Sequence, residues 1–160
     1  MGIEEVQRIK GIFASLVIVL EYLEHEEVIT SEDAATTRGS ALKQGIKAIV
    51  FTNELDWVVV DVPADRKVDQ KKVAEHLGWS KGKIRMGTAE EVMQKTGCMI
   101  GAVPPFGHKE PIRILVDVGL YENEESVFNI GLRTHSVKIK TALMKQVFAS
   151  VGATEGSFSK

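Results

Sequence analysis

The sequence has one cysteine, almost no net charge and no long hydrophobic run, and each shortage excludes a class of protein. Cys98 is the only cysteine, so an intrachain disulfide is excluded and a reducing cytoplasm is expected. The 20 lysines and arginines are balanced by 22 acidic residues, so any nucleic-acid binding needs a local basic patch. The apolar run Ile12–Leu20 is too short to cross a bilayer and has no small-residue cleavage site after it. No membrane partner is expected.

The common catalytic motifs are also missing. The chain has no G-x-S-x-G nucleophile elbow, no Walker loop, no dinucleotide fingerprint and no histidine pair at metal spacing. Cys98 is followed by Met99 and Ile100, which predicts a buried, unreactive thiol. We therefore expect neither a metal nor a cofactor, and no protein catalytic triad.

What is present is typical of a globular domain. Hydrophobic residues make up 44% of the chain and charged residues 26%, and 160 residues are enough for one well-packed core. No repeat, linker or low-complexity segment interrupts the chain. We predict one folded unit over residues 1–153, beginning with a helix, and a polar, frayed tail over residues 154–160.

The hydrophobic spacing predicts helices mixed with strands. Apolar residues at three- and four-residue steps predict a helix over residues 3–23, followed by a short extended segment. Capping residues predict further helices that begin after Thr30 or Ser31, Asp69, Thr88 and Thr141. Strands are predicted over residues 47–51, 57–62, 83–86, 112–118, 127–130 and 136–139. This order favours an α/β (α+β) fold with one mixed, curved or barrel-like sheet surrounded by helices.

Glycine and proline are concentrated in one loop, residues 97–108. Three glycines and two prolines in this stretch exclude a regular helix or a central strand. A stiff loop with bare backbone can direct N–H and C=O groups at a substrate. The alternative is a purely structural turn.

A lysine interrupts an apolar strand at Lys47. It lies either on the exposed side of an edge strand or in a cleft, where its cation would bind a phosphate, a carboxylate or a developing oxyanion. Spacing alone leaves both possibilities open. Among the histidines, His25 and His108 lie beside loops and could line a pocket, whereas His76 is predicted to face solvent.

Basic residues are concentrated in two segments of this nearly neutral chain. Residues 66–85 hold seven of them against two acids: Arg66, Lys67, Lys71, Lys72, Lys81, Lys83 and Arg85. Residues 133–145 add Arg133, Lys138, Lys140 and Lys145 without any acid. These segments are either solvated helix faces or a surface that contacts phosphates.

Several short segments between residues 22 and 150 have the order and spacing of a known family. They are LEH at 23–25, TSEDAA at 30–35, RG at 38–39, GIKAIVF at 45–51, VPADRKVD at 62–69, EEV at 90–92, GAVPPFG at 101–107, and NIG at 129–131 followed by Arg133. Together they resemble the YbaK/ProX family of trans-editing aminoacyl-tRNA deacylases, which also occurs as an insertion domain in bacterial prolyl-tRNA synthetases.

The resemblance implies a barrel-like mixed α/β fold and hydrolysis of the ester that joins an amino acid to the tRNA 3′ end. It assigns the essential lysine to Lys47 and the glycine-x-x-x-proline loop to Gly101 and Pro105, and it implies that a ribose hydroxyl of the substrate helps to activate water. Lys47 and Gly101 are thus the expected catalytic residues. The expected substrate-binding residues are His25, Thr30, Arg38, Pro105, Phe106, Gly107, Asn129, Gly131 and Arg133.

The resemblance also implies a substrate and partners. We expect removal of a small amino acid such as Ala or Cys from tRNA-Pro, with binding of mischarged tRNA by residues 66–85. Prolyl-tRNA synthetase is a candidate partner, and the protein is expected to be a monomer or homodimer. The alternatives are a noncatalytic tRNA- or synthetase-binding module and a deacylase for another small ester or thioester. His108 and His135 match no family position that we can assign.

Overall fold

The computed structural model describes residues 1–27, 30–80 and 82–160, without the side chains of Ser31 and Arg38. The helices are α1 (Ile3–Ser15), α2 (Ser31–Arg38), α3 (Gln70–Leu77), α4 (Ala89–Thr96) and α5 (Thr141–Ser150), with 3-10 turns η1 (Leu42–Gln44) and η2 (Val118–Glu122). The strands are β1 (Glu21–Glu24), β2 (Ile46–Thr52), β3 (Trp57–Pro63), β4 (Arg85–Met86), β5 (Arg113–Asp117), β6 (Glu125–Asn129), β7 (His135–Lys140) and β8 (Thr154–Gly156). Among these helices, none is long and apolar enough to span a membrane.

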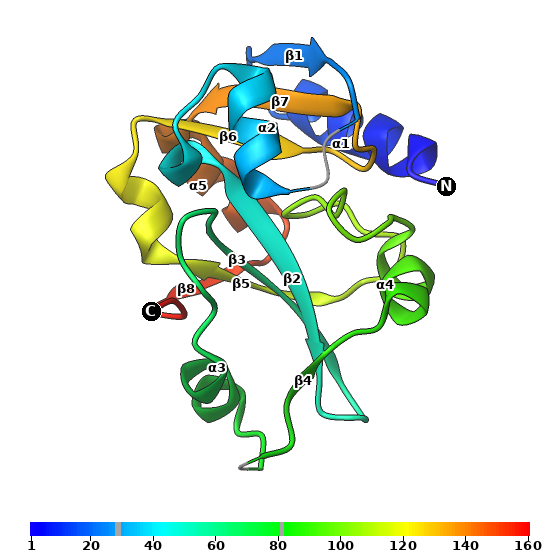
Figure 1. Cartoon of the computed structure of the whole chain (residues 1–160), viewed down its shortest axis with the longest axis vertical. Coiled ribbons are helices and arrows are strands. Elements are labelled where there is room, and N and C mark those ends of the chain that lie inside the picture. The colour runs from blue at the N-terminus through cyan, green and yellow to red at the C-terminus, as the bar shows by residue number, and fades with distance from the viewer. Residues whose placement is uncertain (28–29, 81) are drawn as a thin grey trace.

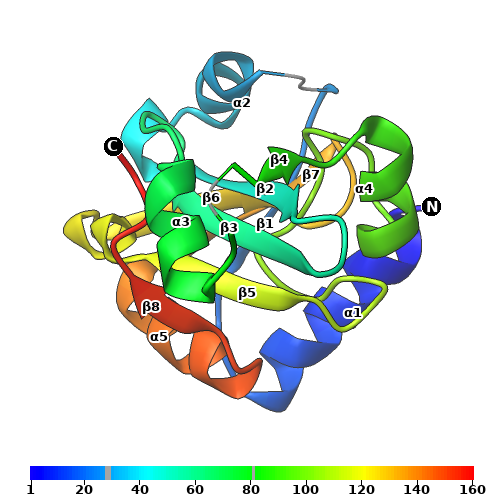
Figure 2. The same ribbon diagram turned by 90° about the horizontal axis from the view of Figure 1, so that it is seen from below.

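The described strands form two sheets. One has the order β4-β2-β3-β5-β8 and the other has the order β1-β7-β6 (Figure 1). β2 and β3 pair antiparallel, whereas β5 runs parallel to both β3 and β8. The sheets meet at a parallel bridge between Gly45 and Val127, and the helices lie around them (Figure 2). The α/β fold class is confirmed, but the strands divide between two sheets where the sequence predicts one.

Local capping signals locate most of the helices correctly. The side chains of Thr30, Asp69 and Thr88 each accept a hydrogen bond from the N–H three residues later, at 3.0 to 3.2 Å. α2, α3 and α4 then end at glycines with left-handed torsions. The prediction that Thr141 caps the last helix is wrong. Thr141 is the first residue of α5, and its Oγ1 lies 2.7 Å from the Ser126 Oγ.

The first predicted helix is too long. α1 ends at Ser15, Val17 adopts a positive φ of 56°, and Glu21–Glu24 form β1 instead of further helical turns. β1 pairs antiparallel with β7, from Glu21 opposite Lys138 to Glu24 opposite His135. Hydrogen bonds to a strand over a hundred residues away therefore override a helical periodicity that continues in the sequence.

The main core lies between α1, α5 and the two sheets. Phe106 is fully buried in it and makes edge-on ring contacts with Phe13, Phe128 and Phe148 at centroid distances of 5.6 to 6.4 Å. These three contacts mean that an aromatic side chain in the core fixes the 97–108 loop. The second half of that loop is consequently part of the core.

The prediction that residues 154–160 are frayed is wrong. Thr154–Gly156 pair in parallel with β5, and Phe158 is 1% exposed in a cluster with Leu115 and Val73. The buried Asp117 carboxylate accepts the backbone N–H groups of Phe158 at 2.7 Å and Ser159 at 3.0 Å. The polar composition of residues 154–160 hides this docking, because a single aromatic side chain and a distant carboxylate produce it.

Replacing Phe158 with alanine should therefore destabilise the whole fold. We expect the free energy of unfolding to fall by about 3–5 kcal/mol, the usual cost of removing a buried Phe. Urea unfolding measures this loss, and Lys160→Ala, an exposed change two residues away, is the matched control. A loss below about 1 kcal/mol for Phe158→Ala would show that the tail is only loosely attached.

Candidate active site

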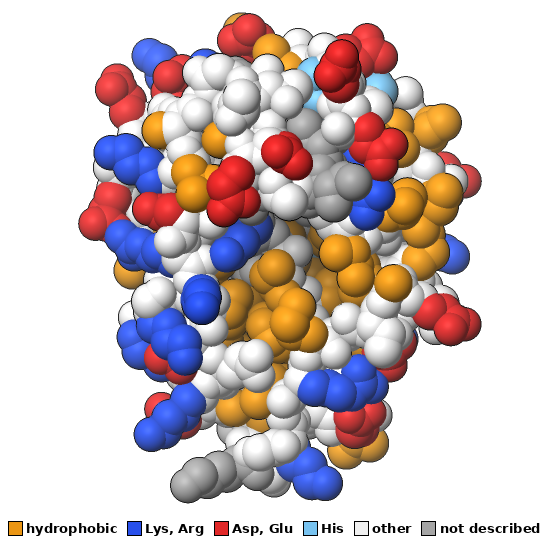
Figure 3. All heavy atoms as spheres, in the orientation of Figure 1, with side chains coloured by type: hydrophobic (Ala, Val, Ile, Leu, Met, Phe, Trp, Pro, Cys, Tyr) orange, Lys and Arg blue, Asp and Glu red, His pale blue; other side chains and the backbone are white. Residues whose placement is uncertain are grey.

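A cavity of about 230 Å³ opens where the two sheets approach each other. β2 pairs with β3 along its whole length but with β4 only through Phe51 and Thr52, so the first half of β2 borders the cavity. Figure 3 shows the hollow with hydrophobic side chains inside it and basic side chains along one side. The lining residues are Thr30, Ala34, Ile46, Lys47, Ala48, Ile49, Val50, Ala64, Met86, Gly87, Val92, Ile100, Gly101, Val103 and Asn129.

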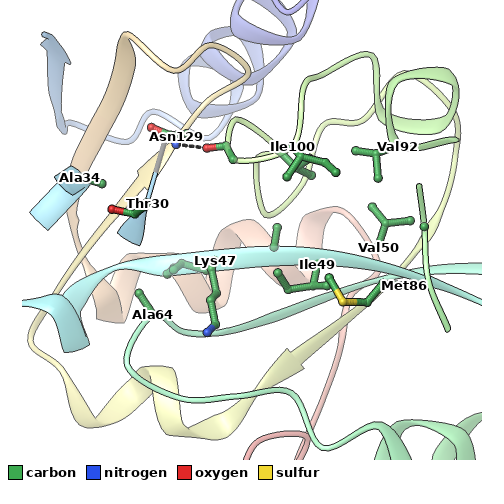
Figure 4. A pocket seen from close by; sticks show the side chains of 15 residues that line it. Thr30, Ala34, Lys47, Ile49, Val50, Ala64, Met86, Val92, Ile100 and Asn129 are labelled. Carbon is green, nitrogen blue, oxygen red and sulfur yellow. Dashed lines mark hydrogen bonds between the residues drawn. The ribbon is translucent and has the colours of Figure 1, made fainter. Parts of the chain in front are cut away.

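The two ends of the cavity differ in chemistry. Figure 4 shows Ile49, Val50 and Met86 grouped with Val92 and Ile100 at one end. The other end is polar and is lined by Thr30, Lys47 and Asn129 (Figure 4). An apolar floor beside a few fixed polar groups is the usual composition of a site for a small organic ligand.

Lys47 is the one cationic side chain in the described lining of this cavity. It is half-buried and has no ion-pair or hydrogen-bond partner among the residues that the structure describes. Burial lowers the pKa of the Lys47 ammonium, although the nearby Asp65 and Glu32 carboxylates act in the opposite direction. The strand register places Lys47 beside Val62, and Figure 4 shows the amine on the side of Ala64. This unpaired charge is suited to an anionic or carbonyl ligand.

Gly101 contributes bare backbone to the wall of the cavity. Its φ is 88°, a left-handed torsion that favours glycine. Neither the Gly101 nor the Val103 N–H has a hydrogen-bond acceptor among the described residues. The carbonyl of Gly101 accepts a 2.5 Å hydrogen bond from Asn129 Nδ2, and the Ile100 carbonyl accepts two from Arg133, at 2.7 and 3.2 Å. The loop is thus held by the Ile100 and Gly101 carbonyls and by the Ala102 N–H, which donates to the Met99 carbonyl, while the N–H groups of Gly101 and Val103 stay available.

Helix α1 holds both ends of the same loop. Gly2 N–H donates to the Gly97 carbonyl at 3.0 Å, and Arg8 donates to the Gly107 carbonyl at 2.9 Å. Arg8 also pairs with the buried Glu5 at 3.1 Å, and a side chain added at Gly97 would approach the Glu5 carboxyl within 2.6 Å. Nothing in the sequence pattern marks Glu5 and Arg8 as contacts of this loop, because two charged residues early in an amphipathic helix look like solvated positions.

The structure brings together only some of the expected site residues. Thr30, Lys47, Gly101 and Asn129 line the cavity. The other expected substrate contacts do not line it: they are His25, Pro105, Phe106, Gly107, Gly131 and Arg133. The Arg38 side chain lies outside the described residues.

Three of these residues outside the cavity have a clear structural role. Phe106 packs in the core, and Gly107 contacts α1, where an added Cβ would lie 2.7 Å from Ile9. Gly131 has a φ of 125° and leaves no room for a side chain beside the Gly2 carbonyl. In the motif GAVPPFG, Gly101 and Val103 therefore line the cavity, whereas Phe106 packs in the core.

The remaining histidines and the cysteine are not placed for catalysis at this cavity. His108 Nε2 lies 2.7 Å from the Pro104 carbonyl, and burial lowers the pKa of its ring to about 4, which keeps it neutral. His76 is exposed and contacts the Phe158 ring, while His135 pairs with Glu24 at 3.1 Å. Cys98 is fully buried, and this burial raises the pKa of its thiol to about 12, as expected of an unreactive cysteine.

The basic segment 66–85 contains two kinds of side chain. Arg66 pairs with Glu122, and Arg85 with Glu54 at 2.7 Å and Glu91 at 2.8 Å. These hydrogen bonds from Arg85 lower the pKa of Glu91 to about 2. Lys72 bonds to the C-terminal segment at Ser157 and Ser159.

The other lysines of the segment are exposed. They are Lys67, Lys71 and Lys83, whereas Lys81 lies outside the described residues. Over the described part of the chain, no group of three His, Cys, Asp or Glu residues is placed to hold a metal ion.

The chain matches one family model and several known proteins. Residues 25–146 match the model described as "Aminoacyl-tRNA editing domain". The Escherichia coli K12 protein "Multifunctional Ser/Thr-tRNA deacylase ProXp-y" is 34% identical over 123 residues, which are 74% of this chain and 72% of that protein. Proline--tRNA ligase of Thermosipho africanus is 30% identical over 101 residues, 63% of this chain and 18% of that one.

A comparison with solved structures finds a protein of the same kind. A crystal structure described as a candidate trans-editing enzyme for prolyl tRNA synthetase superposes with a TM-score of 0.82 at 25% sequence identity. The superposition covers 98% of this chain and 97% of the other.

Proposed function

Because the chain belongs to the aminoacyl-tRNA editing family, we propose that this aminoacyl-tRNA deacylase acts in trans on mischarged tRNA, with Lys47 and Gly101 at its catalytic centre. The observation that carries this proposal is the cavity that unites an unpaired, half-buried ammonium with the available N–H groups of Gly101 and Val103. Positive groups and N–H donors around one small space are what an ester hydrolase needs where negative charge develops.

The hydrolysis follows from these groups. Water attacks the ester carbonyl carbon, and the carbonyl oxygen becomes an oxyanion that the loop N–H groups and the Lys47 ammonium stabilise. The bond from that carbon to the ribose oxygen then breaks. The ribose oxygen takes up a proton, and the amino acid leaves as a carboxylate.

The described cavity lining supplies no carboxylate or imidazole to act as a general base. This fits the role that the family resemblance implies, in which a ribose hydroxyl of the tRNA helps to activate the water. Aminoacyl esters are reactive enough for positioning and oxyanion stabilisation to suffice.

The dimensions of the cavity favour a small aminoacyl group. Its volume of about 230 Å³ is below the range of typical drug-sized pockets, and its end near Thr30 and Asn129 offers a hydroxyl and an amide (Figure 4). The E. coli relative is named for Ser/Thr-tRNA. We therefore extend the expected substrates from Ala and Cys to Ser and Thr. The relationship to proline--tRNA ligases supports prolyl-tRNA synthetase as a partner that supplies the mischarged tRNA.

A deacylation panel should show strong discrimination by size. On one tRNA, we expect Ala, Cys, Ser and Thr to be removed at least about tenfold faster than Pro, since one misplaced methylene costs about 1–3 kcal/mol. The measurement is the loss of labelled amino acid from tRNA-Pro charged with each residue, and Lys47→Ala corrects for spontaneous hydrolysis. Equal rates for Ala and Pro would contradict the size filter. Tight binding of the tRNAs without turnover would instead indicate a noncatalytic module.

Binding of tRNA should depend on the exposed lysines of residues 66–85. If Z of them contact phosphates, log affinity falls against log salt with a slope of about −0.7Z to −0.9Z. Lys71→Glu should weaken binding and make this slope shallower, while hydrolysis of a minimal aminoacyl ester stays unchanged. Lys109→Glu changes the same charge at an exposed position outside the segment and serves as control. If both variants bind equally well, the segment is only a solvated face.

A further inference from the structure

A continuous row of hydrogen bonds runs from His25, the residue after β1, to the wall of the cavity. His25 Nε2 lies 2.8 Å from Ser136 Oγ, Ser136 Oγ lies 3.0 Å from Asn129 Oδ1, and Asn129 Nδ2 lies 2.5 Å from the Gly101 carbonyl. At its outer end, His25 Nδ1 lies 2.8 Å from the Glu26 carbonyl. His25 does not line the cavity, so it reaches Gly101 only through two other side chains.

The direction of each hydrogen bond follows from the two carbonyls at the ends. The Gly101 carbonyl can only accept, so Asn129 presents its amide N–H₂ there and its Oδ1 to Ser136. Ser136 has one hydroxyl proton and donates it to this Oδ1, so its oxygen must accept from His25. The Glu26 carbonyl likewise accepts. Both ring nitrogens of His25 are therefore donors, which only the imidazolium form provides.

Both acidic and basic residues lie on the segment of His25 and on the elements packed against it. On its own segment, Glu24 and Glu27 are paired, the first with His135 and the second with Arg133, each at 3.1 Å. The packed strand β7 contributes His135 and Lys138, and the turn before it contributes Arg133, which also holds the Ile100 carbonyl. Glu26, the next residue in the sequence, is exposed. The backbone of His25 is fixed independently, by its N–H to the Thr134 carbonyl at 3.0 Å.

We propose that His25, as an imidazolium, is a positioning residue that fixes the Gly101 carbonyl through Ser136 and Asn129. Fixing that carbonyl orients the loop at Gly101 and Val103, which line the cavity, so His25 sets the geometry of catalysis without touching the substrate. A neutral ring has one N–H and must give up either Ser136 or Glu26. The catalytic consequence rests on the proposed deacylase function, whereas the positioning of the loop does not.

Substitutions test the row of hydrogen bonds through activity. His25→Leu should lower kcat for deacylation about 10- to 100-fold with little change in KM, since small displacements in an active site cost this much. His25→Gln keeps one donor toward Ser136 and should restore most of the activity. Ser136→Ala should resemble His25→Leu, and the double variant should be no worse than either single one. His76→Leu, an exposed histidine on α3, is the matched control.

A second measurement is independent of activity. Amide hydrogen exchange at Ala102, whose N–H donates to the Met99 carbonyl at 2.9 Å, should become faster in His25→Leu than in wild type at an unchanged unfolding midpoint, and His25→Gln should reverse this. In the wild-type ring, the two ¹⁵N signals should both report protonated nitrogens. Unchanged exchange and unchanged kcat in His25→Leu, additive losses in the double variant, or a neutral wild-type ring would each overturn the proposal. An inactive wild-type protein that still shows the exchange effect would refute the proposed function and leave the positioning role standing.

Discussion

Lys47→Ala is expected to lower kcat/KM for deacylation by about 10²- to 10³-fold, the usual cost of removing one oxyanion-stabilising group. Lys47 carries the positive charge of the described cavity lining, and no described carboxylate neutralises it within ion-pair distance. The same isolation means that its removal breaks no structural contact of the charged group. The variant should therefore remain folded.

The measurement compares single-turnover deacylation with an unfolding curve recorded on the same sample. Lys109→Ala removes an exposed lysine outside the proposed tRNA-binding segment, and it controls for the loss of one positive charge. Lys47→Arg keeps the charge with a different shape and should recover part of the activity. Full activity in a folded Lys47→Ala protein would remove Lys47 from the mechanism.

The lowered pKa of Lys47 gives this prediction a pH signature. Because burial disfavours the ammonium, Lys47 loses its proton at a lower pH than an exposed lysine does, and catalysis declines as pH rises through that value. Lys47→Arg stays charged and should show no such decline. The rate of spontaneous ester hydrolysis is subtracted at each pH.

Gly101→Val is expected to reduce deacylation by at least about 10²-fold, the loss that a displacement of about 1 Å produces. The φ of 88° at Gly101 is strained for any β-branched residue, so the loop must shift to accommodate valine. The new side chain also occupies the cavity wall where the ester approaches. Both effects displace the same N–H groups that are assigned to the oxyanion.

A matched glycine separates backbone strain from loss of the site. Gly78 has a φ of 70° and open space around its position, and it ends α3 away from the cavity. Gly78→Val should therefore destabilise the protein to a comparable degree but preserve kcat. Circular dichroism and kinetics on each variant distinguish the two losses. Wild-type turnover in Gly101→Val would show that the loop has no catalytic role.

The local sequence determined the parts of this protein whose causes are local. Thr30, Asp69 and Thr88 are capping residues whose partners lie three positions later, so the starts of α2, α3 and α4 could be predicted. Two apolar runs separated by a polar turn predicted β2 and β3. The order of short motifs identified the family, with Lys47 and Gly101 as its expected centre, and the cavity does contain both residues.

Only the tertiary structure decided which residues surround that centre. Phe106 belongs to the motif but faces the core, and Glu5 and Arg8 lie far from the motif but hold its loop. The end of α1 and the docking of Phe158 depend on β7 and Asp117, which are distant in sequence. Such contacts depend on strand register and on the complementarity of distant side chains, and neither leaves a periodic signal in the chain.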